Sequence, residues 1–161
     1  MELDMKVAQF LNPEAICLNL KAETAEEVIR VLGTKLHTLG YVKDGFIEAT
    51  LKREENMPTG LPLGGQINAA IPHVDIEFVN KSALGLATLT KPVVFHNMVD
   101  SDEEVPVRLV IMLALDQPKS QITMLQEVSR ILQQPEIIRQ LIEALTPDQV
   151  FSILSGMSAT S

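Results

Sequence analysis

The chain of 161 residues contains one cysteine, no tryptophan and few aromatic residues of any kind. Because Cys17 has no second cysteine to pair with, an intramolecular disulfide and a cysteine-based zinc site are both excluded within one chain. Cys17 lies in the apolar run AICLNL, where we interpret it as a small buried hydrophobic side chain in a reducing compartment. Since aromatic residues make up only 4% of the composition, aliphatic side chains must fill the core.

The sequence also lacks a basic cluster and a long hydrophobic run. The formal net charge is −8 at pH 7, which disfavours binding to nucleic acid or to anionic lipid, and we expect no nucleic-acid partner. The longest unbroken apolar run, residues 109–115, is far shorter than the ~20 residues of a membrane helix, and the N-terminal segment does not resemble a secretory signal. We therefore expect a cytoplasmic protein that is not inserted in a membrane.

Two helices are predicted in the first third of the chain. Thr24 is expected to cap the first helix, with Glu27 completing a capping box and Gly40 ending the helix in a left-handed conformation. Asp44 is expected to be the N-cap of the second helix, which must end before Pro58 because proline cannot continue it.

The remaining elements surround a central apolar segment. Strands are expected at residues 15–20, 67–71, 83–89, 92–95 and 105–115, and further helices at about residues 120–133, 135–144 and 147–154. Residues 105–115 are apolar on both faces, as in a central strand that helices cover on both sides. The pattern predicts an α/β fold, a three-layer sandwich with a mixed central β-sheet flanked by helices. We expect residues 1–155 to form one domain and residues 156–161 a disordered tail.

The stretch MPTGLPLGGQINAAIPHVD, residues 57–75, places one of the chain's three histidines at the end of a predicted strand. His73 follows Pro72 there, where side chains leave the sheet towards loops, solvent and ligands. Taken alone, a histidine in such a place is more often structural or merely exposed. Its neighbours carry the argument for a function.

The motifs of the common ligand sites are missing around His73. His37 and His96 lie on other predicted elements, and no HxxxH pair or pair of cysteines accompanies them, so we expect no metal and no cofactor. The acidic loop at residues 97–104 lacks the ligand spacing of an EF-hand. The glycines of TGLPLGG match neither a P-loop nor a dinucleotide-binding motif, and no serine lies in a GxSxG elbow.

The neighbours of His73 favour nucleophilic chemistry on an anion. A neutral imidazole with a pKa near 6.5 is a competent nucleophile at cellular pH, and arginine binds a phosphoryl group through paired hydrogen bonds. Arg53, at the end of the second predicted helix, and Thr59, in the turn that follows, are the candidates for holding the phosphoryl oxygens. Ordinary roles are also open, since Arg53 fits a solvated cation at a helix end and Thr59 a turn residue.

The segments LKREENMPTG, residues 51–60, and AAIPH, residues 69–73, resemble the signature of the fructose/mannitol-type enzyme IIA family of the bacterial phosphotransferase system. In that family an Arg-Glu pair ends a helix, a Thr-Gly turn follows, and the active histidine closes an Ile-Pro-His strand end. The similarity extends to RLVIMLAL and to the C-terminal helices, so it covers nearly the whole chain. The long segment between Gly60 and Pro72, together with PTG and NKSALGL, resembles the galactitol-specific branch.

The resemblance implies a phosphohistidine relay and its partners. His73, through Nε2, would accept a phosphoryl group from the histidine carrier protein HPr and pass it to a cysteine of an enzyme IIB, which acts with a membrane enzyme IIC. Arg53 would stabilise the charge of this group, and Thr59 would hold its oxygens. Glu54 would orient Arg53, although a surface pair with Lys52 is also open to it.

One departure from the family pattern concerns a helper residue. Many relatives carry a second histidine just after the last strand, where it assists the first. In this chain Ser120 stands roughly at that position, and His96 is not assumed to replace the missing histidine. The departure puts a mechanism with two histidines in doubt.

Two other functions are open from the sequence. A regulatory enzyme IIA-like protein would bind a target protein according to the phosphorylation of His73, through the same chemistry. An anion-binding module without turnover is a third possibility, although a nucleophile placed after the strand argues against it. The sugar or polyol is not indicated, because the relay subunit never contacts it.

Overall fold

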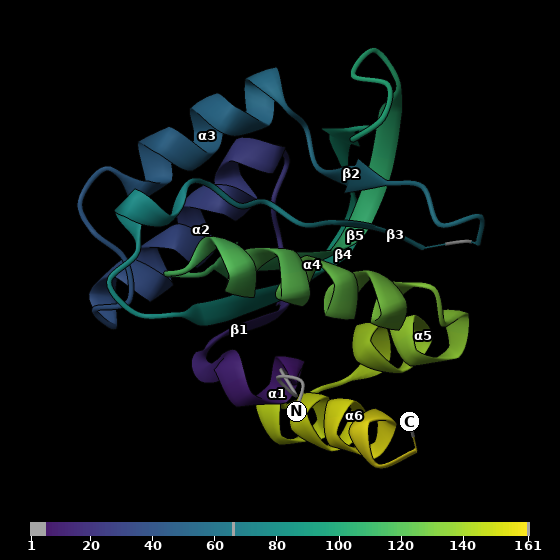
Figure 1. Cartoon of the computed structure of the whole chain (residues 1–161). Coiled ribbons are helices and arrows are strands. Elements are labelled where there is room, and N and C mark those ends of the chain that lie inside the picture. Colours follow the sequence, from purple (N-terminus) through teal and green to yellow (C-terminus); the bar gives the residue numbers. More distant parts are fainter. Residues whose placement is uncertain (1–5, 66, 161) are drawn as a thin grey trace.

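The computed structural model describes residues 6–65 and 67–160, with side chains described as far as residue 156. In this part of the chain, five strands form one mixed sheet in the order β1-β4-β5-β3-β2, and helices cover both of its faces (Figure 1). The strands are β1 Leu11–Leu20, β2 Gly60–Leu61, β3 Asn68–Ala70, β4 Ala83–His96 and β5 Glu104–Ala114. The predicted α/β sandwich with a mixed central sheet is confirmed.

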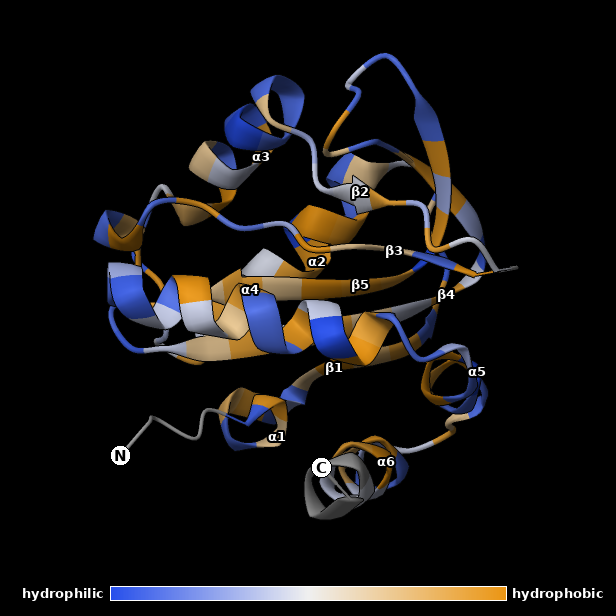
Figure 2. Ribbon diagram, turned by 45° about the vertical axis from the view of Figure 1, so that its right-hand side comes forward, coloured by the Kyte–Doolittle hydropathy of each residue, from blue (hydrophilic) through white to orange (hydrophobic). Residues whose placement is uncertain are grey.

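The helices divide into two layers. Helices α2 and α3 cover one face of the sheet, and α4 and α5 cover the other, with α1 and α6 packed together below them in the view of Figure 1. Figure 2 shows that the strands between the layers are mostly hydrophobic, whereas the helices carry hydrophilic residues on their outer sides. The helix bounds are α1 Val7–Phe10, α2 Ala25–Thr38, α3 Phe46–Asn56, α4 Pro118–Leu132, α5 Pro135–Glu143 and α6 Pro147–Thr160, with a 3-10 turn at Ile76–Phe78. Within these described residues, none of the helices is long and apolar enough to span a bilayer.

Strand β5 is the central strand that the sequence predicts. It pairs antiparallel with β4 and parallel with β3. Leu109, Ile111 and Leu113 pack in the core beneath α4, α5 and α6, while Val110 and Met112 pack in the core beneath α2 and α3. From Leu109 to Ala114 the strand is buried on both faces, which accounts for the continuous apolar run.

The first predicted helix has the expected ends. The Thr24 hydroxyl accepts the Glu27 N–H at 3.2 Å, which confirms Thr24 as the N-cap, and Gly40 follows the helix with φ 86°. The capping box is incomplete, because the Glu27 carboxylate accepts the N–H of Glu23, at 2.9 Å, rather than that of Thr24. The Glu27 carboxylate therefore binds the backbone one residue further upstream than a capping box predicts.

The predicted N-cap of the second helix is wrong. Gly45, with φ 93°, is the residue that precedes α3, and no side chain caps the helix start. The Asp44 carboxylate instead lies 2.6 Å from Nε2 of His37, at the end of α2. Glycine reaches this left-handed conformation without strain, so the turn starts the helix one residue later and leaves Asp44 to pair across the two helices.

Strand β4 joins two predicted strands into one. Its register with β5 is irregular between Thr88 and Val93, the stretch that contains Pro92. A proline cannot donate to the ladder and is tolerated at such an irregularity. Arg108, for which the sequence suggests no role, donates from Nε to the carbonyl of Leu89 at 3.1 Å and so satisfies a carbonyl where the ladder is interrupted.

Two short elements, α1 and β2, were not predicted from the sequence. The predicted tail, residues 156–161, overlaps α6, which continues to Thr160, and residue 161 lies outside the described residues. The limits of the domain stay a prediction.

Candidate functional site

The candidate site lies where α3, β2 and β3 meet. Arg53 and Glu54 belong to the last turns of α3, and Thr59 directly precedes β2. The chain returns through β3 and continues to His73, which forms a parallel bridge with Leu113 of β5. The structure therefore brings together the four residues that the sequence singles out in this region.

Two hydrogen bonds with backbone groups hold His73 in place, one at the preceding residue and one at its ring. The Leu113 N–H donates to the carbonyl of Pro72 at 3.0 Å, which holds the strand end against β5. Nδ1 of His73 lies 2.7 Å from the carbonyl oxygen of Ile71. Because a carbonyl can only accept, Nδ1 carries the proton, and the lone pair of the neutral ring is on Nε2.

The environment of His73 favours the neutral ring. The residue is only 7% exposed, so it is more enclosed than its predicted place at a loop suggests. This burial lowers the pKa of His73, and the nearby charge of Arg53 lowers it as well. The bond to Ile71 and the carboxylate of Asp75 act in the opposite direction without reversing the shift. The imidazole is thus neutral near pH 7, with the lone pair of Nε2 free of a proton.

Arg53 is incompletely paired for a guanidinium. Its Nη1 lies 3.4 Å from Oδ1 of Asp75, a long contact for a charged pair. Its Nε is buried and has no hydrogen-bond partner among the described residues. Buried donors are normally satisfied, so this orphaned N–H beside a nucleophile suits the oxygen of an anion. Sequence reasoning did not single out Asp75, although its position two residues after His73 was a usable signal.

Glu54 and Thr59 are bonded to each other. The Glu54 carboxylate accepts the Thr59 N–H at 2.8 Å and the Thr59 hydroxyl at 2.8 and 3.1 Å from its two oxygens. Burial raises the pKa of Glu54, against the opposing effects of these hydrogen bonds and of the charges of His96 and Arg53. The expected roles, Glu54 orienting Arg53 and Thr59 holding phosphoryl oxygens, stay predictions.

Of the two candidates for a helper residue, Ser120 lies elsewhere, whereas the charge of His96 acts on the Glu54 carboxylate of the site. Ser120 lines a pocket of about 480 Å³ together with Asp116, and His73 does not belong to that pocket. His96 is exposed at the end of β4, and its Nδ1 lies 2.8 Å from the carbonyl oxygen of Ser101. Neither arrangement shows a second histidine or a serine in contact with the His73 ring.

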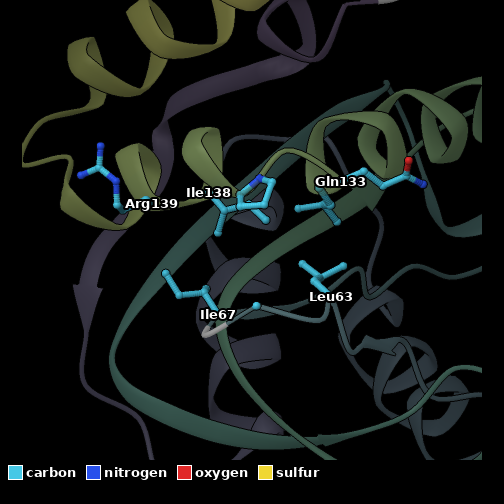
Figure 3. Close-up of a pocket in the computed structure, with 8 residues that line it drawn as sticks. Leu63, Ile67, Gln133, Ile138 and Arg139 are labelled. Atoms are coloured by element: carbon cyan, nitrogen blue, oxygen red, sulfur yellow. The ribbon is translucent and has the colours of Figure 1, made fainter.

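An apolar pocket of about 220 Å³ opens on the other side of the sheet from α3, between the β2–β3 loop and helices α4 and α5 (Figure 3). The cation of the lining, the guanidinium of Arg139, is paired with Glu136 and Glu143 of the same helix. The lining comprises Leu63, Gly65, Ile67, Leu132, Gln133, Pro135, Ile138 and Arg139.

Among the described residues, no group of three histidine, cysteine or acidic side chains is placed to hold a metal ion.

Known proteins are similar to this chain in sequence and in fold. A family model described as "Phosphoenolpyruvate-dependent sugar phosphotransferase system, EIIA 2" matches residues 9–157. The galactitol-specific EIIA component of Escherichia coli (strain K12) is 36% identical over 116 residues, which are 72% of this chain and 76% of that protein. The 2-O-alpha-mannosyl-D-glycerate-specific EIIABC component of the same organism is 30% identical over 161 residues, which are 97% of this chain and 23% of that protein.

A solved structure extends the comparison to the fold. In the complex of enzyme IIAMTL and phosphorylated enzyme IIBMTL from Escherichia coli, the similar chain has a TM-score of 0.74 and 29% identity, and the match covers 90% of this chain and 96% of that one. The mixed sheet between two layers of helices is thus the fold of a solved enzyme IIA. The chain belongs to the type 2 EIIA family of the phosphoenolpyruvate-dependent sugar phosphotransferase system. It is a phosphotransferase component, as the resemblance implies.

Proposed function

We propose that this chain accepts a phosphoryl group on Nε2 of His73 from the phosphohistidine of HPr and passes it to a cysteine of an enzyme IIB in the cytoplasm. The observation that carries the proposal is the contact of His73 Nδ1 with the carbonyl of Ile71, at 2.7 Å. It commits one ring nitrogen to the proton and leaves the lone pair on the other. A membrane enzyme IIC is the indirect partner.

The chemistry consists of two displacements at phosphorus. The lone pair of His73 Nε2 forms a P–N bond while the P–N bond of the donor phosphohistidine breaks, and the donor ring recovers its lone pair. A cysteine thiolate of enzyme IIB then forms a P–S bond as the P–Nε2 bond breaks. Because the transferred group passes through a loose transition state, alignment and charge stabilisation are what the protein must supply.

Arg53 supplies the charge in this proposal. Its buried Nε has no partner among the described residues, and its contact with Asp75 is long, so the guanidinium has donors to offer. Thr59 is the second proposed phosphate-binding residue. Its hydroxyl donates to Glu54 in this structure, so it reaches a phosphoryl oxygen only by rotating away from that carboxylate.

We propose a galactitol-type system as the one that this carrier serves. The support is the 36% identity with the galactitol-specific EIIA component. The matched region covers 76% of the length of that protein. The enzyme IIB partner is supported by the solved relative, which is an enzyme IIAMTL in complex with phosphorylated enzyme IIBMTL.

The test is reconstitution with radiolabelled phosphoenolpyruvate, enzyme I and HPr. We expect acid-labile phosphate on the chain, its loss in His73→Ala, and transfer of the label to a galactitol-type enzyme IIB faster than to a mannitol-type one. Unchanged labelling of His73→Ala would refute the site. A labelled chain that no enzyme IIB discharges would favour the regulatory function over the transport relay.

A further inference from the structure

The carboxylate of Glu54 begins a continuous series of hydrogen bonds that ends at the nucleophile. It accepts both the N–H and the hydroxyl of Thr59, so two of its bonds converge on one residue. In Figure 1 this is the point where α3 leads through a turn into β2. Thr59 is 1% exposed, so a donor left unpaired there would have no water to replace its partner.

The next bonds carry the constraint across the sheet. The carbonyl of Thr59 accepts the N–H of Ile71 at 3.2 Å, just beyond the antiparallel pairing of Gly60 with Ala70. The carbonyl of Ile71 in turn accepts Nδ1–H of His73 at 2.7 Å. The residue whose carbonyl fixes the tautomer of the nucleophile is thus held through its N–H, in the preceding peptide, by the turn that Glu54 anchors.

We propose that Glu54 is a positioning residue for phosphoryl transfer, and that it acts on His73 through Thr59 and Ile71 rather than through Arg53. The inference rests on the proposed function of His73. It differs from the role expected from the family resemblance, because the hydrogen bonds described for Glu54 go to Thr59 and that described for Arg53 goes to Asp75. A carboxylate suits this task, since bonds to a charged acceptor are shorter and stronger than neutral ones.

Loss of the anchor has a specific chemical consequence. If the Thr59 turn moves, the carbonyl of Thr59 no longer holds the N–H of Ile71, and the carbonyl of Ile71 loses its position opposite Nδ1 of His73. The tautomer of a histidine is set by the hydrogen bond that its other ring nitrogen makes. A fraction of the rings then carries the proton on Nε2, where it blocks the lone pair that attacks phosphorus.

The experiment compares Glu54→Gln with Glu55→Gln, an exposed carboxylate one position further along the same helix. Two-bond proton–nitrogen correlation spectra of the unphosphorylated proteins report the tautomer of His73, and quench kinetics with phospho-HPr report kcat and KM. For Glu54→Gln we expect signal from the Nε2–H tautomer and a kcat lower by about ten- to a hundred-fold, with KM changed less than about two-fold. For Glu55→Gln we expect wild-type values.

A second variant guards against a simple loss of folding. Thr59→Val removes the hydroxyl from the pair and keeps the backbone N–H, so it should shift the same tautomer signal in a protein that still unfolds cooperatively. A wild-type tautomer in both Glu54→Gln and Thr59→Val would overturn the proposal. So would a Glu54→Gln variant that raises KM and leaves kcat unchanged. The tautomer is read without any phosphoryl donor, so failure of the wild type to accept label would refute the proposed function and leave this test standing.

Discussion

Nδ1 of His73 lies 2.7 Å from the carbonyl oxygen of Ile71, two residues earlier in the chain. The contact ties the protonation of the His73 ring, the proposed nucleophile, to the path of the backbone at the end of β3. Because that backbone is paired with β5 on one side and with β2 on the other, the sheet itself sets which nitrogen of the ring carries the proton. The proposed reactivity of His73 therefore depends directly on the fold.

The rate of phosphoryl transfer should fall on acidification only at a pH below the ordinary pKa of histidine. Burial and the charge of Arg53 lower the pKa of His73, so the ring stays neutral below the value of about 6.5 at which an ordinary histidine gains its proton. With phospho-HPr in excess, the rate of labelling should stay constant as the pH falls past about 6.5 and should drop only in more acidic solution. An NMR titration of His73 gives the same pKa independently. A midpoint above the ordinary value would contradict the environment described.

The same shift of the His73 pKa should appear in the stability. In the unfolded chain His73 has its ordinary, higher pKa, so as the pH falls below about 6.5 the unfolded state binds a proton that the native state does not. His73 therefore contributes a loss of stability on acidification, down to its native pKa. Urea unfolding of the wild type and of His73→Gln at several pH values isolates this contribution. The wild type should lose more stability across this range, and parallel curves would contradict the shift.

Arg53→Ala should slow phosphoryl transfer without unfolding the protein. Loss of one charge-assisted hydrogen bond to the transferred group costs roughly 1.5–3 kcal/mol, which is about a ten- to a hundred-fold lower rate. The pKa of His73 should also rise towards its ordinary value, because the positive charge that helps to lower it is gone. Lys52→Ala, which removes an exposed cation from the preceding position, is the control. An unchanged transfer rate in Arg53→Ala would leave the arginine with no part in the reaction.

Gly60→Ala should destabilise the junction of β2 and β4. A Cβ at this position would lie 2.5 Å from the carbonyl oxygen of His96, a backbone atom that cannot rotate away. We expect a loss of about 1–3 kcal/mol in the free energy of unfolding, as for other overpacked sites. Gly65→Ala, where a Cβ meets nothing within 4 Å, is the matched control. Thermal unfolding of both variants is the measurement. Equal melting temperatures would show that β2 and the end of β4 move apart without a loss in the free energy of unfolding.

The sequence predicts the layers of this fold well because they depend on hydrophobic patterning. The run at residues 105–115 indicates a strand that is buried on both faces, and β5 has this place in the sheet. Thr24 and Gly40 mark the ends of α2 through backbone chemistry that is local to a few residues. Asp44 fails as a predicted cap because its partner, His37, is supplied by a neighbouring helix.

The residues of the candidate site can be picked out from the sequence, but the hydrogen bonds between them cannot. The order of Arg53, Thr59 and His73 is visible in one dimension, and the structure brings these residues together. The pairing of Glu54 with Thr59 depends on the geometry of the turn after α3. Strand β2 has only two residues, which is too short to show the hydrophobic alternation of a strand in the sequence. The enclosure of His73 likewise depends on neighbours that are distant in sequence.

The most direct test of the account is to locate the phosphoryl group on the phosphorylated protein. The chain has three histidines, His37, His73 and His96, and each ring has two nitrogens. Phosphorus–nitrogen correlation NMR after phosphorylation by phospho-HPr should show one phosphohistidine, at Nε2 of His73. Phosphate on Nδ1 of that ring, or on either of the other two histidines, would contradict the central claim that the Ile71 carbonyl prepares Nε2 as the nucleophile.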